Sequence, residues 1–221
     1  RNLPPELGRP GDAPGAGQAP RASTGALSPA TQGVVAGLLD FLAQDGCTDA
    51  EFDAMALRLF EHQYTHNAPL RRFCQGRGVT PRRIRHWHEI PAVPINAFKE
   101  LTLSCEPPEA CERVFMTSGT TRAEVKGRHH HPTIAVWDLS MRRGFERYFM
   151  QGFGGAGGMP TAAGEARAGD DARGVPASPR VPMALLFPPE EELGNSSLGR
   201  YLSQALRLFG APGSAHFVST Q

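Results

Sequence analysis

The chain has 221 residues and a formal net charge of +1. It is long enough to bury a substantial core, and it has no surplus of positive charge that would draw it generally to nucleic acid or acidic membranes. Its four cysteines form no CxxC pair and no dense framework, which indicates reduced thiols rather than the disulfides of small secreted domains. No apolar run approaches the ~20 residues that span a bilayer, and the N-terminus has no signal-peptide core. We therefore expect a cytoplasmic protein with no membrane span and no nucleic-acid partner.

Two stretches have the composition of unfolded sequence. Residues 1–28 are dominated by proline, glycine and alanine, with almost no large apolar side chains to offset the entropy lost on ordering. Residues 151–180 are rich in glycine and alanine, and structured-looking sequence resumes beyond them. We expect a disordered tail at 1–28 and a flexible insertion at 151–180 within one folded unit over 29–221. Because the chain starts with Arg1 and stops at Gln221 directly after a strand-like run, truncation at either end stays open.

Helical patterns dominate the first part of the folded unit. Ser28-Pro29 is a typical helix start, and the apolar residues after it share one helical face: Val34, Val35, Leu38, Leu39 and Leu42. Thr48 and Glu51 have the spacing of a capping box, and the apolar residues that follow recur at helical intervals: Phe52, Met55, Ala56, Leu59 and Phe60. The sequence therefore predicts two amphipathic helices that build the core. Prolines then mark an irregular connection, in which we expect Trp87 to be a core residue.

Short strands alternate with helices in the second part. The apolar runs predict strands over Arg113–Met116 and Val181–Phe187, the latter in a buried position, and a third over Ala215–Ser219. Helices are expected over Thr133–Phe149 and Ser196–Phe209. The residues of the second helix expected to face inward are Leu198, Tyr201, Leu202, Ala205, Leu206 and Phe209. The predicted fold class is α/β, with a helical N-terminal section followed by a sheet with flanking helices.

The sharpest feature is a hydroxyl-rich turn directly after the first strand: Thr117, Ser118, Gly119, Thr120 and Thr121. A phosphate needs several converging hydrogen-bond donors, which the backbone N–H groups of such a turn can supply as an anion nest. Gly119 permits positive φ, the hydroxyls add donors, and Lys126 can place a mobile cation near the same phosphates. The composition suits equally a plain turn whose hydroxyls cap local backbone groups. No GxxxxGK[ST] loop occurs in the chain.

The run Thr117–Thr121, followed by Lys126-Gly127 and a histidine, resembles the [ST]-S-G-[ST]-T-G-x-P-K-G signature of adenylate-forming enzymes. It departs from that signature at Arg122, where the family has glycine, and in the spacing to Lys126, which is one residue longer. Three further segments are similar to acyl-protein synthetases of the LuxE type. They are an entry region with Phe60, Gln63, Asn67, Pro69 and Phe73, a P-x-x-P-x-x-x-F-K segment at Pro91–Lys99, and Asn195–Gly199 after Pro188-Pro189. The resemblance covers roughly residues 30–221 and only the N-terminal portion of the family's length.

This resemblance implies a partial N-terminal domain of an adenylate-forming enzyme. Enzymes of this type activate a long-chain fatty acid with ATP and Mg²⁺ to an acyl-adenylate and transfer the acyl group to a protein thiol. In luminescent bacteria they serve an acyl-reductase partner. By the match, Thr117–Thr121 hold the phosphates of ATP, Lys126 is an accessory cation and Lys99 is a second candidate. Catalysis of this kind depends largely on positioning and charge neutralisation.

Other residues have both a site interpretation and an ordinary one. Lys99 also suits a solvated lysine, and Ser196 and Ser197 suit a helix N-cap as well as a nucleotide or acyl pocket. Adjacent histidines in an extended chain point to opposite faces, so His129–His131 are not expected to converge on one metal ion. Two interpretations of these histidines stay open: one of them lies near the acyl-phosphate region, or all three belong to a surface run. A basic cluster around Trp87 fits a solvated face better than a nucleic-acid interface: Arg82, Arg83, Arg85, His86 and His88.

The acyl acceptor is the part of this chemistry that the sequence does not supply. In the family the accepting thiol lies near the far C-terminus, whereas all four cysteines here precede the loop: Cys47, Cys74, Cys105 and Cys111. We interpret Cys105 and Cys111 as small apolar residues. Two alternatives to the fatty-acid ligase therefore stay open. One is a ligase for another carboxylic acid with a coenzyme A acceptor, and the other is a non-catalytic remnant or binding module of the same fold.

Overall fold

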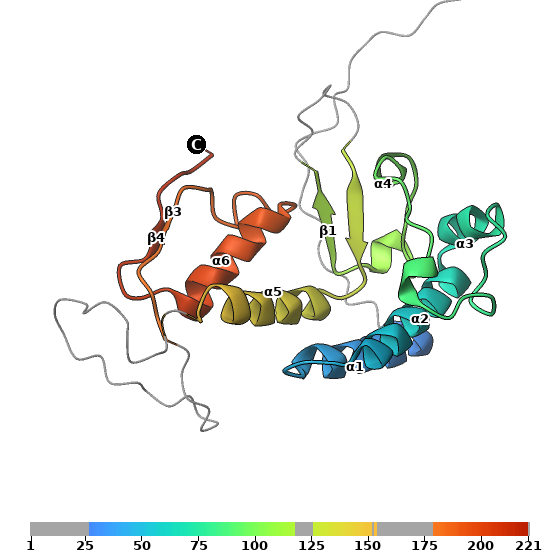
Figure 1. Ribbon diagram of the computed structural model, residues 1–221. Helices are drawn as coiled ribbons and strands as arrows, with labels where there is room; N and C mark the ends of the chain where they lie inside the picture. The colour runs from blue at the N-terminus through green and yellow to red at the C-terminus, as the bar shows by residue number, and fades with distance from the viewer. Residues whose placement is uncertain (1–26, 118–125, 152, 154–178, 221) are drawn as a thin grey trace, which may run out of the picture.

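The computed structural model describes residues 27–117, 126–151, 153 and 179–220. These residues form a mostly helical, mixed α/β structure with a few short strands in two small sheets (Figure 1). The helices are α1 (Pro29–Ala43), α2 (Asp49–His66), α3 (Ala68–Gln75), α4 (Ala97–Glu100), α5 (Ala135–Tyr148) and α6 (Ser197–Phe209), with 3₁₀ turns η1 (Trp87–Glu89) and η2 (Pro108–Ala110). The strands are β1 (Arg113–Met116), β2 (Arg128–His131), β3 (Ala184–Leu185) and β4 (Ala215–His216). The predicted tail and insertion lie almost wholly outside the described residues.

The N-terminal helices begin at the caps that their sequence provides. Ser28 caps α1, and Thr48 and Glu51 form the complete capping box of α2. Asn67 Oδ1 accepts a hydrogen bond from Leu70 N–H at the start of α3. The chain from α2 to the segment after α3 encloses a buried apolar cluster: Phe60, Leu70, Cys74 and Ile84. The apolar face predicted for α1 is only half-buried, although α1 packs against both α2 and α5.

The strands form two separate sheets rather than the single sheet expected. β1 pairs antiparallel with β2, with Met116 opposite Arg128 at the loop end and Arg113 opposite His131 at the other end. The sequence did not predict β2, because consecutive histidines show none of the apolar–polar alternation that marks a strand. β3 pairs in parallel with β4, and Val181 adds one bridge to this second sheet.

The prediction of a buried strand over Val181–Phe187 is wrong in extent and in burial. The strand itself covers only two of these residues, and the Leu186 side chain is 79% exposed. Pro182 has no N–H to donate to a ladder, and within the described residues β3 has a single strand partner. The strand predicted over Ala215–Ser219 is also shorter than expected, because β3 pairs with it at only two positions.

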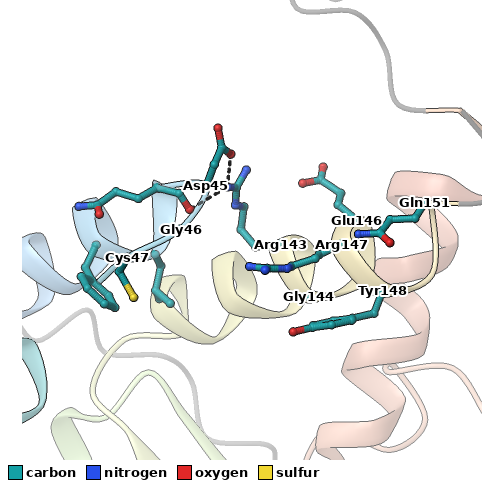
Figure 2. Close-up of a pocket in the computed structure, with 12 residues that line it drawn as sticks. Asp45, Gly46, Cys47, Arg143, Gly144, Glu146, Arg147, Tyr148 and Gln151 are labelled. Carbon is teal, nitrogen blue, oxygen red and sulfur yellow. Dashed lines mark hydrogen bonds and ion pairs between the residues drawn. The ribbon is translucent and has the colours of Figure 1, made fainter. Parts of the chain in front are cut away.

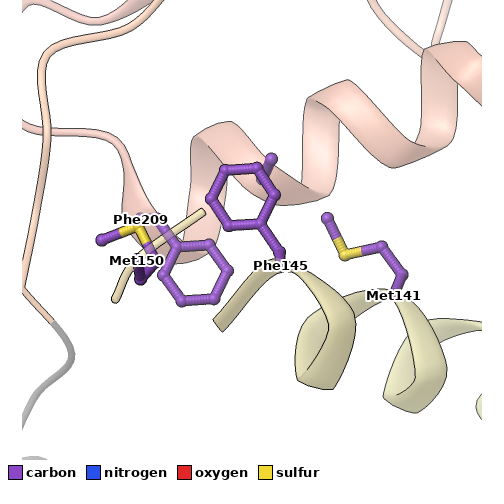
Figure 3. Close-up of a cluster of buried hydrophobic side chains, with 5 residues drawn as sticks. Met141, Phe145, Met150 and Phe209 are labelled. Atoms are coloured by element: carbon purple, nitrogen blue, oxygen red, sulfur yellow. The ribbon is translucent and has the colours of Figure 1, made fainter. Parts of the chain in front are cut away.

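A second apolar cluster lies where α5 meets α6. Figure 3 shows Met141 and Phe145 of α5, with Phe209 at the end of α6 and Met150 beside it. Ala205 completes the cluster, and Phe209 is only 1% exposed. Burial of these side chains joins two helices that are about fifty residues apart in the sequence, which is the main apolar contribution to this half of the molecule.

The start of α6 combines a correct prediction with a wrong one. Ser196 caps the helix as predicted, because its Oγ accepts a hydrogen bond from Gly199 N–H at 3.0 Å. Leu198, which was expected to face inward, is 49% exposed. It lies in the first turn of α6, ahead of the part of the helix that α5 covers from Tyr201 onward.

Trp87 is a surface residue, so its assignment to the core is wrong. Its side chain is 52% exposed and meets Phe52 edge-on, with ring centroids 5.8 Å apart. The Trp87 N–H donates to Asp53 Oδ1 at 2.8 Å, and His86 Nδ1 lies 2.9 Å from Asp53 Oδ2. These contacts attach η1 to the outer side of α2, where Phe52 itself is 44% exposed. The aromatic ring therefore covers one apolar neighbour and leaves its other side in solvent.

The β1–β2 hairpin stands between the two halves of the molecule (Figure 1). α4 contacts β2 on one side, while α5 runs beneath the hairpin and packs against both α1 and α6. The hairpin is therefore where segments from the N-terminal and C-terminal halves meet. None of the helices that the structure describes is both long enough and apolar enough to cross a membrane.

Candidate functional site at the base of the 117–127 hairpin

The turn predicted to hold phosphate is closed at its base by two hydrogen bonds. Thr117 N–H donates to the Gly127 carbonyl at 3.0 Å, and Gly127 N–H donates to Thr117 Oγ1 at 3.0 Å. Because Thr117 Oγ1 accepts in this pair, its hydroxyl hydrogen is left to donate to another group. Ser118, Gly119, Thr120 and Thr121 lie outside the described residues, so their phosphate contacts stay a prediction.

Gly127 is buried at the point where the hairpin meets the Pro91–Lys99 segment. A Cβ on this residue would lie 3.2 Å from Thr117 Cγ2 and 3.6 Å from Phe98 Cβ. The first distance is tighter than ordinary packing, so a larger residue would displace the Thr117 side chain. Glycine thus permits the close approach that holds the Thr117 hydroxyl at the base of the loop.

The Asn195–Gly199 segment lies along the other edge of β1. The Met116 N–H donates to the Asn195 carbonyl at 2.9 Å, one residue before the loop begins. Arg113 Nη1 donates to the Gly194 carbonyl at 2.9 Å. The N-terminus of α6 is therefore held beside the end of β1 that leads into the loop.

Phe98, from the Pro91–Lys99 segment, reaches the same place from the opposite side. Its ring stacks on His129 of β2, with centroids 4.3 Å apart and an interplanar angle of 13°. Phe98 also lines a cavity together with Gln63 and Asn67, which belong to the helical entry region. In the described residues, the two ends of the loop therefore adjoin the Pro91–Lys99 and Asn195–Gly199 segments, and the helical entry region reaches Phe98 through this cavity.

The chain contains only two lysines, Lys99 and Lys126, and each is the sequence neighbour of a residue at this base, Phe98 or Gly127. Lys126 is exposed and immediately precedes Gly127, while Lys99 is exposed and follows Phe98 in α4. The other basic residues of the chain are arginines and histidines. The position of both lysines suits an accessory role toward an anion bound in the loop, as the sequence predicted for Lys126.

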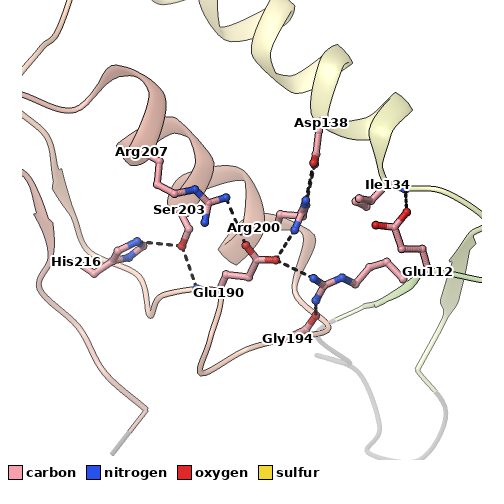
Figure 4. A network of polar contacts seen from close by, with 10 residues as sticks. Glu112, Ile134, Asp138, Glu190, Gly194, Arg200, Ser203, Arg207 and His216 are labelled. Carbon is pink, nitrogen blue, oxygen red and sulfur yellow. Dashed lines mark hydrogen bonds and ion pairs between the residues drawn. The ribbon is translucent and has the colours of Figure 1, made fainter. Parts of the chain in front are cut away.

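A network of charges with Glu190 and Arg200 buried at its centre holds the C-terminal side of the site (Figure 4). Arg200 donates to Asp138 through Nε and Nη2, at 2.8 and 2.6 Å, and to Glu190 through Nη1 at 2.6 Å. Arg113 Nη2 lies 3.1 Å from the same Glu190 oxygen, and Arg207 lies 3.9 Å from the other. Because Arg113 belongs to β1 and Arg200 to α6, the network fixes the strand against the helix. Sequence reasoning missed it, since these residues are distant in the chain and no local pattern pairs them.

A serine–histidine pair at the edge of this network is structural. Ser203 Oγ lies 3.1 Å from His216 Nε2, and His216 Nδ1 lies 2.7 Å from the Phe187 carbonyl. The distances suit a nucleophile and its base. However, Ser203 is only 5% exposed and accepts a hydrogen bond from Glu190 N–H. The pair therefore ties β4 to α6 rather than presenting a nucleophile.

The three adjacent histidines of β2 each have a different set of neighbours. His129 stacks on Phe98, His131 meets Phe115 at a centroid distance of 5.0 Å, and His130 lines the cavity beside Phe98. Burial lowers the pKa of both His130 and His131. Within the described part of the chain, no group of three His, Cys, Asp or Glu side chains is placed to hold a metal ion.

Three of the four cysteines are in surroundings that disfavour the reactive thiolate. Burial raises the pKa of Cys105 to about 11, with Glu106 and Cys111 adding to the effect. Burial also raises the pKa of Cys74 and of Cys111. The neutral thiol is the weaker nucleophile, so these residues are poor candidates for the acyl acceptor. Cys47 is exposed and lies in the connection between α1 and α2.

A groove of about 870 Å³ lies between the end of α1 and α5 (Figure 2). Arg143 spans it by donating to the Gln44 carbonyl and to Asp45 Oδ1, at 2.9 and 2.7 Å. The groove is open, and Tyr148 on its wall is 76% exposed. None of the residues quoted for the resemblance lines it. We therefore place the candidate site at the hairpin and not in this groove.

Comparisons of the chain with protein-family models, with curated proteins and with solved structures found no match.

Proposed function

We propose that this chain binds Mg·ATP at residues 117–127, which connect the two strands of the β1–β2 hairpin, and activates a carboxylic acid as its acyl-adenylate. The proposal makes it part of an ATP-dependent acid–thiol ligase of the acyl-protein synthetase type, in the form of a partial N-terminal domain. A long-chain fatty acid is the first substrate class to test, and an acyl-reductase is the matching partner. The observation that carries the proposal is that Phe98 and Asn195, from two of the motif segments, adjoin the two ends of the loop at Gly127 and Met116.

The described residues fit a bound triphosphate in two respects. Gly127 lets the two ends of the loop approach closely, and the Thr117 hydroxyl donates to none of the residues that the structure describes. Lys126 and Lys99 offer two cations on the rim. Mg²⁺ usually keeps several waters and binds through substrate phosphates and one or two carboxylates. We therefore expect it to arrive with the nucleotide rather than at a protein cage.

In the proposed reaction a carboxylate oxygen of the acid attacks the α-phosphorus of ATP. A bond forms between the carboxylate oxygen and the α-phosphorus. The bond from the α-phosphorus to the oxygen that bridges to the β-phosphorus breaks, and pyrophosphate leaves with that electron pair. The protein contributes by holding the reactants in line and by neutralising the charge on the phosphates. This chemistry needs donors and cations more than a nucleophilic side chain, which agrees with a site rich in hydroxyl and lysine residues.

The acyl acceptor in this proposal is a thiol outside the four cysteines of the sequence. Cys74, Cys105 and Cys111 have raised pKa values, and Cys47 lies in the connection between α1 and α2. A protein thiol, as in acyl-protein synthetases, or the thiol of coenzyme A would serve. The competing proposal is a non-catalytic binding module of the same fold, and turnover separates the two.

The test is acid-dependent release of pyrophosphate from Mg·ATP by the full-length protein, with octanoate, dodecanoate, palmitate and benzoate as the acids. We expect release with at least one acid. Thr117→Val, which removes the hydroxyl but keeps the shape, should weaken the affinity for Mg·ATP by about tenfold. Thr65→Val on exposed α2 is the matched control, because Thr65 Oγ1 donates only to the Glu61 carbonyl of its own helix. Binding of ATP without pyrophosphate release for any of the acids would favour the non-catalytic module.

A further inference from the structure

The chain from the end of α2 to η1 has a one-sided balance of charge. Between His62 and His88 it contains no aspartate, glutamate or lysine. The same stretch contains six arginines: Arg71, Arg72, Arg77, Arg82, Arg83 and Arg85. Because the whole chain has a formal net charge of only +1, this stretch concentrates positive charge in one part of a nearly neutral protein.

Most of these arginines are exposed in the connection between α3 and η1. Cys74 and Ile84 are 0% and 5% exposed, and they hold this connection against the apolar cluster of the α2–α3 pair. Between them, Arg83 Nη1 donates to the Gly78 carbonyl at 3.0 Å, next to Arg77 in the chain. We call the exposed side chains of this connection and of η1 the arginine surface: Arg77, Arg82, Arg83, Arg85 and Trp87.

No carboxylate of the described residues forms an ion pair with an arginine of this surface. Glu89 instead accepts hydrogen bonds from the backbone N–H groups of Arg85 and His86. Asp53 accepts from the Trp87 N–H and contacts His86 Nδ1. By contrast, five arginines of β1, α5 and α6 each pair with a carboxylate: Arg113, Arg142, Arg143, Arg200 and Arg207. The arginine surface therefore keeps its positive charge available to another molecule.

Trp87 gives this surface an apolar centre that is already held in place. Its backbone N–H is hydrogen-bonded to Asp53, and its ring packs edge-on against Phe52 while 52% of the side chain stays exposed. Next to it, the rings of His86 and His88 stack at a centroid distance of 5.4 Å. A side chain that is ordered before binding loses less entropy on association. Tryptophan and arginine are also the residues that most often dominate the energy of protein interfaces.

The composition of the surface favours an acidic protein over a nucleic acid. Arginine pairs with carboxylates through two parallel hydrogen bonds, and protein interfaces are enriched in arginine and aromatic residues but depleted in lysine. The surface has this composition, since none of its basic residues is a lysine. Binding to nucleic acid depends mainly on neutralising many phosphates, for which a chain of net charge +1 has little surplus.

We propose that the arginine surface docks an acidic segment of a partner protein. Carboxylates of that segment pair with Arg77, Arg82 and Arg85, and an apolar side chain between them covers the Trp87 ring. This inference concerns a surface that the proposed function does not use, and it does not depend on adenylation at the hairpin.

The experiment uses a fluorescein-labelled peptide with the repeat Asp-Glu-Leu-Glu, and a neutral control peptide with Asn and Gln in place of Asp and Glu. Fluorescence anisotropy with the wild-type chain should show saturable binding of the acidic peptide alone, weakened by added salt. The chain has two tryptophans, so Trp137→Phe leaves Trp87 as the single reporter. Its emission should shift to shorter wavelength when an unlabelled acidic peptide covers the ring.

Matched variants locate the binding. Arg82→Gln/Arg85→Gln and Trp87→Ala should each weaken the affinity for the acidic peptide by about tenfold. Arg142→Gln/Arg147→Gln removes the same charge from exposed positions of α5 and should change the affinity by less than about twofold.

Three outcomes would overturn the inference. One is the absence of saturable binding of the acidic peptide to the wild-type chain. Another is an equal loss in the α5 variant, or none in Trp87→Ala, which would mean a general attraction between opposite charges. The third is tighter binding of a DNA duplex or of phosphatidylserine vesicles through the same arginines, which would assign the surface to nucleic acid or to a membrane. None of these measurements uses ATP, so failure of the adenylation proposal would leave their outcome unaffected.

Discussion

The two apolar clusters of the molecule are stabilised in different ways. The N-terminal cluster, from Phe60 to Ile84, is built by residues close in the sequence on helices with their own caps. The C-terminal cluster between α5 and α6 lies beside the buried Arg200–Glu190–Asp138 network, whose members come from distant segments. The first region therefore follows local sequence signals, whereas the second depends on long-range pairing. Because Arg113 of β1 joins the network, the hairpin depends on the second region for its position.

The largest expected effect is the same in both regions, because both clusters rest on buried aromatic side chains. Phe60 is 2% exposed and Phe209 is 1% exposed. We expect Phe60→Ala and Phe209→Ala each to lower the free energy of unfolding by about 4 kcal/mol, measured by urea denaturation. Leu198→Ala is the control, since this half-exposed side chain should contribute about 1 kcal/mol or less. A Leu198→Ala loss as large as that of Phe209→Ala would contradict the assigned core.

The charge network should separate the two regions. Arg200→Ala leaves Asp138 and Glu190 without their shared partner in a mostly buried setting, so we expect a loss of about 3 kcal/mol in the free energy of unfolding. Arg207→Ala removes a partner at 3.9 Å whose side chain is 55% exposed, and its loss should be about 0.5 kcal/mol. Equal effects of the two substitutions would mean that the network does not stabilise this region.

Two helix caps provide a matched pair across the regions. Thr48→Ala and Ser196→Ala each remove a side-chain acceptor at a helix N-terminus, so each should cost about 1 kcal/mol in the free energy of unfolding. Ser196 adjoins Asn195, which pairs with β1, and Thr48 is at the far end of α2. We therefore expect only Ser196→Ala to weaken Mg·ATP binding as well, measured by calorimetric titration. Equal nucleotide affinity in the two variants would mean that the Ser196 cap does not contribute to the nucleotide site.

The smallest effect is a pH dependence in the N-terminal region. Burial raises the pKa of Glu106, but hydrogen bonds from Ser28 and Thr31 outweigh it, and the pKa lies below its ordinary value of 4.5. A lowered folded-state pKa stabilises the fold above pH 4.5, and this contribution is lost as the pH falls through the folded-state value. Glu106→Gln should therefore be less stable than wild-type at pH 7, with a gap that narrows below pH 4.5. A gap that is constant with pH would contradict the role of the carboxylate.

The sequence predicted most of what depends on neighbouring residues. The cap at Ser196, the capping box of Thr48 and Glu51, and the strand Arg113–Met116 are confirmed. The predictions failed where pairing with a segment distant in the sequence determines the local structure. β2 forms because β1 pairs with its histidines, and the strand within Val181–Phe187 is short because β4 pairs with only two of its residues.

The candidate site shows the same division. The motifs identified Thr117, Gly127 and Lys126, but they did not reveal which of the three histidines lines a cavity. That depends on the position of Phe98, Asn67 and Leu70 around His130. The charge network was likewise invisible, because Asp138 and Arg200 are 62 residues apart. The predicted roles of Ser118–Thr121 concern residues outside the part of the chain that the structure describes.

The most direct test uses the two lysines of the chain as reporters of the hairpin. Reductive methylation with ¹³C-formaldehyde labels Lys99 and Lys126, and keeps their positive charge. On titration with Mg·ATP we expect both methyl signals to shift with one common, saturable dissociation constant, and Thr117→Val to weaken it by about tenfold. No shift of either signal at saturating Mg·ATP, or shifts unchanged in Thr117→Val, would contradict an ATP site at the base of this hairpin.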